Sequence, residues 1–324
     1  NDPAYRESVL RLAPEDAYRR AVKDVNHRVV QYVQQAYQSD RTFLTNQASI
    51  DRLTAIMAPA VEAGQLQIAD LTNAHLSTLF GVKHPPAPDL STFERPNISR
   101  VRELARPFWT AIKAAEKGKD FDAALAAGEA RLTKMVETDL QMAKVRQARE
   151  VLKAGGIRRY ARVTGGNACW LCEIAATQVY YTEDLLPIHP GCNCSVQPIP
   201  EGGEAEIRQG FTPEEILKHS DDQAKLMLGL VEDEAPLGVY QDLVAVREHG
   251  EIGPVLTWKH QSFTGPQDLP VPPSREVLEQ QAFDAVQQSG GVTINLAGQS
   301  PHDGYAYAPF KGTEMVVPQK EFTP

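Results

Sequence analysis

Cysteine is scarce in this chain of 324 residues, and long hydrophobic runs are missing from it. No apolar stretch approaches the roughly 20 residues that a helix needs to cross a bilayer. Nothing near the first residue resembles a secretion signal, so the sequence does not support folding in an oxidising compartment. Positive charge is not in excess either, because the formal net charge is −9, which argues against a protein that coats nucleic acid with its whole surface. We expect cytoplasmic folding and no membrane contact.

Three common catalytic signatures are also absent: a Gly-rich phosphate loop, a His-Glu-x-x-His motif and a Gly-x-Ser-x-Gly nucleophile elbow. Ser300, His302 and Asp303 lie close together in the sequence, but the members of a catalytic triad normally come from distant segments. Polar turn residues are the ordinary explanation for such a group. We assign no catalytic residue, so the sequence favours a non-enzymatic role and leaves an enzymatic one open.

What the first half does contain is apolar residues at spacings of three and four, the period of amphipathic helices. The pattern predicts four helices: the first over Asp16 to Gln38, the second capped by Ser49 and running toward Gly81, the third starting at Asn97 or Ser99, and the fourth from Asp120 to the stop at Gly155-Gly156. Residues 81 to 97 are rich in proline and predict a connector. We therefore expect residues 1–156 to form a helical domain.

Basic residues gather at the end of the fourth predicted helix and just after it, opposed only by Glu150. The stripe consists of Lys144, Arg146, Arg149, Lys153, Arg158, Arg159 and Arg162. On an acidic protein such a stripe suggests a localised acidic partner, either packaged nucleic acid or an acidic protein face. A solvated helix face is the alternative, and both interpretations stay open.

After the fourth predicted helix, the spacing of apolar residues changes to every second residue, the period of a β-strand. Residues 160 to 163 and 178 to 181 alternate and predict strands of a small β-containing unit, residues 157–266, with short helices at 213 to 219, 220 to 230 and 241 to 248. Turn residues follow at 249 to 254 and at 263 to 266. A helix capped by Ser274 and strand-like runs at 292 to 296, 305 to 308 and 315 to 317 predict the start of a C-terminal α+β appendage, residues 274–324. The expected class is α+β, mainly α.

All four cysteines lie between positions 169 and 194, in a Cys-x-x-Cys pair and a His-Pro-Gly-Cys-Asn-Cys segment. Two such clusters can aim thiolates from separate loops at one tetrahedral centre, which is the arrangement of a closed structural zinc site. The candidate ligands are Cys169, Cys172, His189, Cys192 and Cys194. Which four of the five would bind is left open.

Three other interpretations of the cysteines are less well supported. Disulfides need an oxidising compartment, and a thioredoxin-like pair needs a strand and helix around the motif that the sequence does not predict. A catalytic metal needs an open coordination position, whereas five ligands for about four positions oversupply the site. We expect structural zinc.

The order of these features resembles the head-morphogenesis domain of phage Mu F-like minor head proteins. The resemblance rests on the helical first half followed by Arg158-Arg-Tyr-Ala-Arg-Val-Thr, Cys169-x-x-Cys172 and Ile188-His-Pro-Gly-Cys-Asn-Cys194, with Phe211-Thr-Pro-Glu-Glu-Ile-Leu and Lys225-Leu-Met-Leu-Gly229 as a closing segment. It covers about residues 15 to 265, and its specific motifs lie within about 160 to 230. Asn193 stands where the family usually has a basic residue.

The resemblance implies a minor capsid protein of a tailed phage, assembled in the host cytoplasm and located in the virion near the portal. Its implied partners are the portal protein, the major capsid protein and packaged DNA, with multiple copies around the portal. Relatives carry variable C-terminal appendages, so a capsid-maturation protease or other hydrolase fused to this domain is the alternative. A cellular zinc-containing nucleic-acid-binding protein is a third hypothesis.

Overall fold

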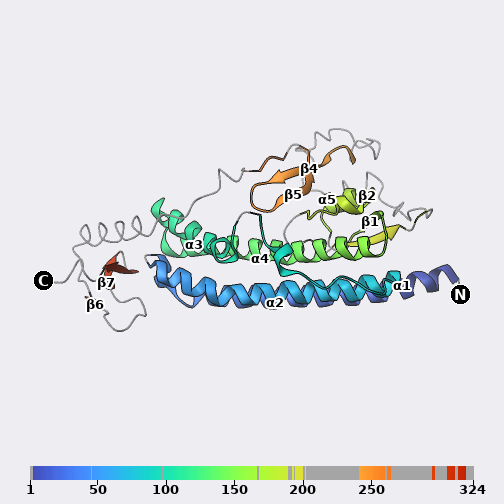
Figure 1. The fold of residues 1–324 in the computed structure, drawn as a ribbon. Coiled ribbons are helices and arrows are strands. Elements are labelled where there is room, and N and C mark those ends of the chain that lie inside the picture. The colour runs from blue at the N-terminus through green and yellow to red at the C-terminus, as the bar shows by residue number, and fades with distance from the viewer. Residues whose placement is uncertain are drawn as a thin grey trace. The chain divides into compact units, whose positions relative to one another are not determined.

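The computed structural model of the chain is mainly helical, with a few small antiparallel sheets (Figure 1). It describes residues 3–44, 46–96, 98–165, 168–188, 192, 194–199, 201, 241–259, 261–263, 294–295, 305–310 and 313–318. Side chains are described from residue 15 to residue 263 within these ranges, Trp170 excepted. The mainly α, α+β class and the helical first half predicted from the sequence are confirmed.

Four helices make up the first half of the chain. They are α1 (Pro3–Gln38), α2 (Gln47–Phe80), α3 (Arg100–Glu116) and α4 (Phe121–Ala154). Gly81 and Gly156 end α2 and α4 with φ of 66° and 69°, a conformation that glycine adopts without a Cβ clash. The predicted ends of the first, second and fourth helices are therefore confirmed, whereas α1 begins well before the predicted Asp16.

Two predicted helix starts, at Ser99 and Asp120, are confirmed, and the predicted cap at Ser49 is corrected. Asp120 Oδ1 accepts a hydrogen bond from the Ala123 amide at 2.8 Å at the start of α4, and Ser99 is the residue before α3. Ser49 does not cap α2, because Asn46 Oδ1 accepts from the Ala48 amide at 3.0 Å one turn earlier. The Ser49 hydroxyl is instead buried, 2.8 Å from the Thr42 hydroxyl.

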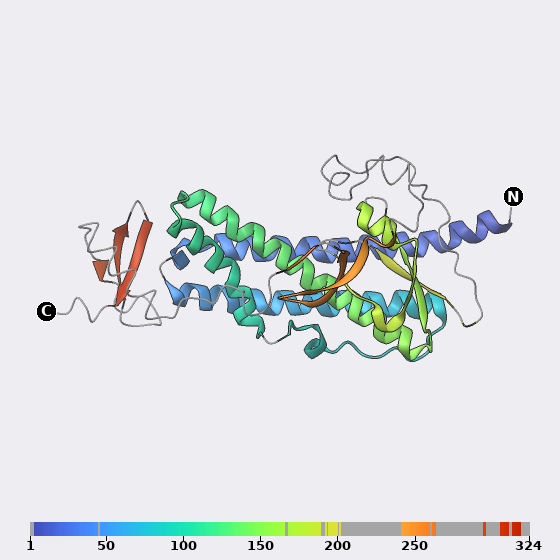
Figure 2. The same ribbon diagram turned by 90° about the horizontal axis from the view of Figure 1, so that it is seen from above.

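The chain divides into two compact units, which are described one at a time. The first consists of residues 1–28, 62–97 and 136–269, and the second of residues 29–61, 98–135 and 270–324. Within each unit, parts of α1, α2 and α4 lie side by side, as the two views show (Figures 1 and 2). The domain boundaries predicted from the sequence stay a prediction.

Aromatic packing forms the core of the second unit. The short 3-10 helix η1 (Arg41–Leu44) buries Phe43 between Tyr37 of α1 and Phe108 of α3, with ring centroids 4.7 to 5.1 Å apart. The Tyr37 hydroxyl donates to the carbonyl oxygen of Leu125 in α4 at 3.3 Å. This unit also holds a three-stranded antiparallel sheet, β6 (Ile294–Asn295), β7 (Tyr305–Phe310) and β8 (Thr313–Pro318), which confirms the three predicted strand runs.

A second three-stranded antiparallel sheet belongs to the first unit, in the order β2-β1-β3. Its strands are β1 (Arg159–Val163), β2 (Val179–Tyr181) and β3 (Ser195–Ile199). Tyr160 of β1 is fully buried against Leu76 of α2 and Leu152 of α4, so the sheet rests on the ends of two helices. The strands predicted at 160 to 163 and 178 to 181 are confirmed, and β3 was not predicted.

A β-hairpin completes the first unit: β4 (Val244–His249) pairs with β5 (Gly253–Trp258). The helix predicted over 241 to 248 is wrong, because Val244 and Val246 are β-branched and find cross-strand partners in β5. The predicted turn at 249 to 254 connects the two strands. The helices predicted at 213 to 230 and after Ser274 lie outside the described residues.

Candidate metal centre

Three buried cysteines meet in the first unit. The Sγ atoms of Cys172, Cys192 and Cys194 all lie within 4.8 Å of one another, so the three thiols could hold a metal ion. The Sγ atom of Cys172 is 3.6 Å from that of Cys192 and 3.6 Å from that of Cys169. All four cysteines are free thiols. The structure thus brings together four of the five predicted ligands, the four cysteines. The fifth, His189, lies outside the described residues.

Local structure explains how the two cysteine clusters converge. A short helix, α5 (Trp170–Ala175), begins directly after Cys169, whose carbonyl oxygen accepts from the Glu173 amide at 3.0 Å. Cys169 and Cys172 therefore stand within one helical turn. The second pair lies at the entrance to β3, where residues two positions apart point to the same side of an extended chain. The sequence pattern predicts ligands on separate loops and does not predict α5.

Apolar side chains enclose the cysteines. Leu171 and Ile174 of α5 share one buried cluster with the thiols, together with Leu256 and Trp258 of the hairpin. The Leu256 amide donates to the Pro187 carbonyl oxygen at 3.0 Å, which fixes the hairpin beside the cysteine loop. Sequence reasoning missed this contribution because the hairpin begins about 50 residues after Cys194, although the short apolar run Val255-Leu256 with Trp258 beside turn residues is consistent with a buried strand.

This environment sets the protonation of the thiols. The pKa of Cys172 is raised by hydrogen bonding with the Cys169 thiol and then with the Cys192 thiol, and burial raises it further. The pKa of Cys194 is raised to about 12, because hydrogen bonding with Cys192 and burial outweigh the lowering effect of the Cys172 contact. Thiols in such surroundings stay protonated unless a cation binds, so metal binding would release protons.

The sulfur spacing fits tetrahedral zinc. With Zn–S bonds of about 2.3 Å, neighbouring thiolates of a tetrahedron lie about 3.8 Å apart. The two Sγ–Sγ distances of 3.6 Å are close to that edge length. The buried, apolar enclosure is typical of a closed structural site rather than of one that must admit substrate.

The predicted basic stripe does not form one surface. Lys144 and Arg162 are buried, at 7% and 6% exposure, and donate to backbone carbonyl oxygens. Their placement in an exposed stripe is corrected, because residues that are turned into the core cannot meet a partner. The other stripe residues are at least partly exposed: Arg146, Arg149, Lys153, Arg158 and Arg159. Whether these five bind a partner stays a prediction.

The comparisons with known proteins match the sequence of this chain to one family. The family model of the VG15 protein matches residues 11–221, well over half of the chain. The chain belongs to the VG15 protein family. This is a phage protein family and indicates a virion-associated protein, while the Mu F-like assignment stays a prediction. No curated protein and no solved structure matches the chain. In the part of the chain that the structure describes, none of the helices is both long and apolar enough to cross a membrane.

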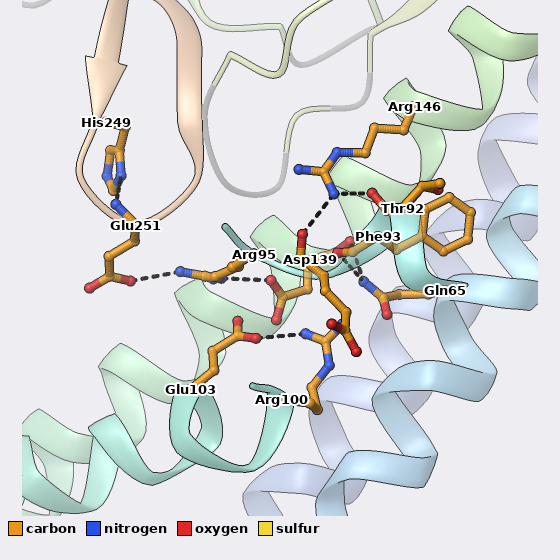
Figure 3. Close-up of polar contacts among 11 residues, drawn as sticks. Gln65, Thr92, Phe93, Arg95, Arg100, Glu103, Asp139, Arg146, His249 and Glu251 are labelled. Carbon is orange, nitrogen blue, oxygen red and sulfur yellow. Dashed lines mark hydrogen bonds and ion pairs between the residues drawn. The ribbon is translucent and has the colours of Figure 1, made fainter. Parts of the chain in front are cut away.

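The first unit also contains a cavity of about 450 Å³, and residues of the VG15-family segment form most of its lining. Arg146 and Arg149 of α4 line one side, and the apolar part of the lining includes Met142, Leu186 and Ile252. Arg146 donates to the carbonyl oxygens of Thr92 and Glu94, as Figure 3 shows for Thr92.

Arg95, which lines this cavity, belongs to a network of buried charges. The Arg95 guanidinium is 2% exposed and donates to Asp139 Oδ1 of α4 at 2.9 Å and to Glu251 Oε2 at 2.6 Å, in the turn of the β4–β5 hairpin (Figure 3). Gln65 of α2 donates to the carbonyl oxygen of Asp139 at 3.1 Å. The network joins α2, α4, the proline-rich connector and the hairpin, so the wall of the cavity is a fixed part of the fold.

Proposed function

We propose that this chain is a minor head protein of a tailed phage that acts at the portal vertex, inside the capsid, during procapsid assembly. The observation that carries the proposal is one family match that spans α1 to α4 and all four cysteines together. A phage family indicates a virion-associated protein, and the resemblance of residues 158 to 194 to head-morphogenesis domains supports the finer assignment. No residue is assigned a catalytic role.

We propose further that the cysteine cluster holds one structural zinc ion. The sulfur spacing, the burial of Cys172, Cys192 and Cys194 and the apolar enclosure support this assignment. Zinc, when bound, would tie α5 to the entrance of β3 and so close the loop between residues 172 and 192. Because sites of this kind rarely exist in an unfolded chain, the free energy of metal binding would add to the free energy of folding.

The exposed basic residues would then bind an acidic segment of the portal protein. Arg146 and Arg149 line the 450 Å³ cavity together with apolar side chains. Apolar lining favours a protein segment over packaged DNA, since DNA affinity comes mainly from phosphate contacts. Lys153, Arg158 and Arg159 extend the positive charge beyond the cavity.

The test is a binding assay between purified portal protein and the full chain. The variant carries Arg149→Glu, Lys153→Glu and Arg158→Glu, which reverses exposed charges and leaves the buried Lys144 and Arg162 intact. The matched control reverses three lysines in the second unit: Lys113, Lys117 and Lys119. Exposed charge changes rarely cost much stability, so both variants should keep their helicity.

We expect the wild-type chain and the control to retain the portal and the variant to lose it. Equal binding by all three proteins would contradict the assigned surface, and no binding by the wild type would contradict the portal assignment. Steeply salt-dependent binding to DNA instead would favour the nucleic-acid-binding alternative.

A further inference from the structure

Two buried cations stand beside the cysteine cluster, and neither pairs with a carboxylate in the part of the chain that the structure describes. Lys144 Nζ donates to the carbonyl oxygens of Cys192 and Cys194, at 3.1 and 3.0 Å. Arg162 Nη2 donates to the Leu186 carbonyl oxygen at 2.6 Å, and its Nε atom has no acceptor among the described residues. Both residues belong to the first unit, as the cysteines do.

One buried acid of the first unit, Glu15, already has partners of its own. Glu15 of α1 pairs with Arg19 at 2.9 Å and with His75 at 2.8 Å, and it accepts from the Ser195 hydroxyl. Within the described ranges, neither Lys144 nor Arg162 forms an ion pair with a carboxylate. A buried charge that is not neutralised costs several kcal/mol, so a negative group is required nearby.

The cysteine thiols are placed to supply this negative charge when they bind a metal as thiolates. A small cavity of about 20 Å³ is lined by Lys144, Arg162 and Cys194 together.

Charge balance selects the ligand set. A zinc ion with four thiolates carries −2, which two buried cations neutralise, whereas three thiolates and a neutral imidazole carry −1 and leave one cation unbalanced. We propose that Lys144 and Arg162 are the built-in counter-charges of a tetrathiolate centre formed by Cys169, Cys172, Cys192 and Cys194, with His189 outside the ligand set. The inference rests on the proposed metal centre and resolves the choice among five ligands.

Lys144 has a second role as a positioning residue. Its ammonium group bridges the carbonyl oxygens of Cys192 and Cys194, so it holds the backbone on both sides of residue 193 in one geometry. A preorganised loop binds metal more tightly, because less conformational entropy is lost on binding. Removing the ammonium should therefore weaken metal binding even where the thiols are unchanged.

The first experiment counts thiolates in the unmodified full chain. Zinc is replaced by Co²⁺, and the intensity of the sulfur-to-cobalt charge-transfer absorption reports the number of bound thiolates. We expect a four-thiolate spectrum, unchanged in His189→Ala. A three-thiolate spectrum, or loss of cobalt in His189→Ala, would overturn the inference while leaving the metal centre in place. Failure to bind any metal would overturn the proposed centre itself.

The second experiment measures zinc affinity by competition with a chelator. Lys144→Met keeps an unbranched side chain that is one atom shorter and removes its charge. Lys153→Met is the matched control on the same helix, where the lysine pairs with Glu150 on the surface. We expect Lys144→Met to weaken zinc binding about 10- to 100-fold, as loss of groups that support metal ligands typically does, and Lys153→Met to leave it unchanged. Equal affinities would overturn the role of Lys144. If Lys144→Met does not fold, the thiolate count in the wild type still decides the ligand set.

Discussion

Replacing Gly128 with alanine tests the packing of the second unit, because two physical effects predict opposite signs. Gly128 lies inside α4, where alanine is favoured over glycine by about 1 kcal/mol of helix propensity. From the sequence alone, Gly128→Ala should therefore stabilise the protein.

The structure predicts the reverse. A Cβ atom at position 128 would lie 2.7 Å from the carbonyl oxygen of Pro107 in α3 and would overlap the hydroxyl group of Tyr37 in α1. The carbonyl belongs to the backbone and cannot rotate away, so α3 and α4 would have to separate. Overpacking of this kind costs about 1–3 kcal/mol, which more than offsets the propensity gain. We expect a net loss of about 1 kcal/mol in the free energy of unfolding, after the propensity gain is subtracted.

Urea denaturation followed by circular dichroism measures this loss. The control is Ala126→Gly, at an exposed position of the same helix, which should lose only the propensity difference of about 1 kcal/mol. Tyr37→Phe in the Gly128→Ala background removes the overlapping hydroxyl and should recover part of the loss. A Gly128→Ala protein as stable as the wild type, or more stable, would refute the close approach of the three helices.

Three further predictions concern the first unit. Removing metal with a chelator should lower the melting temperature of a chain that contains about one zinc ion, and Cys192→Ser should lower it similarly without chelator. Arg95→Met should cost about 3–5 kcal/mol in urea denaturation, because it removes one partner of the buried ion pair between Arg95 and Asp139. Burial raises the pKa of Glu15, but hydrogen bonds from His75 and Ser195 and the charge of Arg19 lower it by more, so its folded pKa lies below 4.5. The stability that Glu15 contributes is complete above pH 4.5 and is lost as the pH falls through the folded value, and Glu15→Gln should remove that part of the acid dependence.

The sequence predicted what local patterns determine. The helix ends at Gly81 and Gly156 and the helix start at Asp120 follow from residues in direct contact with the helix ends, and the structure confirms them. The cysteine cluster was found because soft metal ligands at short spacings are rare by chance. The predicted cap of α2 was wrong because two polar residues, Asn46 and Ser49, lie near the start of this helix. Asn46 is the one that caps it.

Long-range contacts were beyond prediction from pattern alone. Nothing in the helical period of α4 separates the buried Lys144 from the exposed Lys153, because the difference arises only when the cysteine loop packs on that helix. The sequence pattern predicts a helix over 241 to 248, because the strand character of residues 244 to 248 depends on pairing with β5. Tertiary partners override local propensity in both cases.

The most direct test of the proposed role is a reconstruction of phage particles without imposed symmetry, combined with a label on this chain. The account predicts labelled density inside the capsid at the portal vertex, in several copies around the portal. Density for the chain spread evenly over the capsid shell, or particles that lack it, would contradict the account.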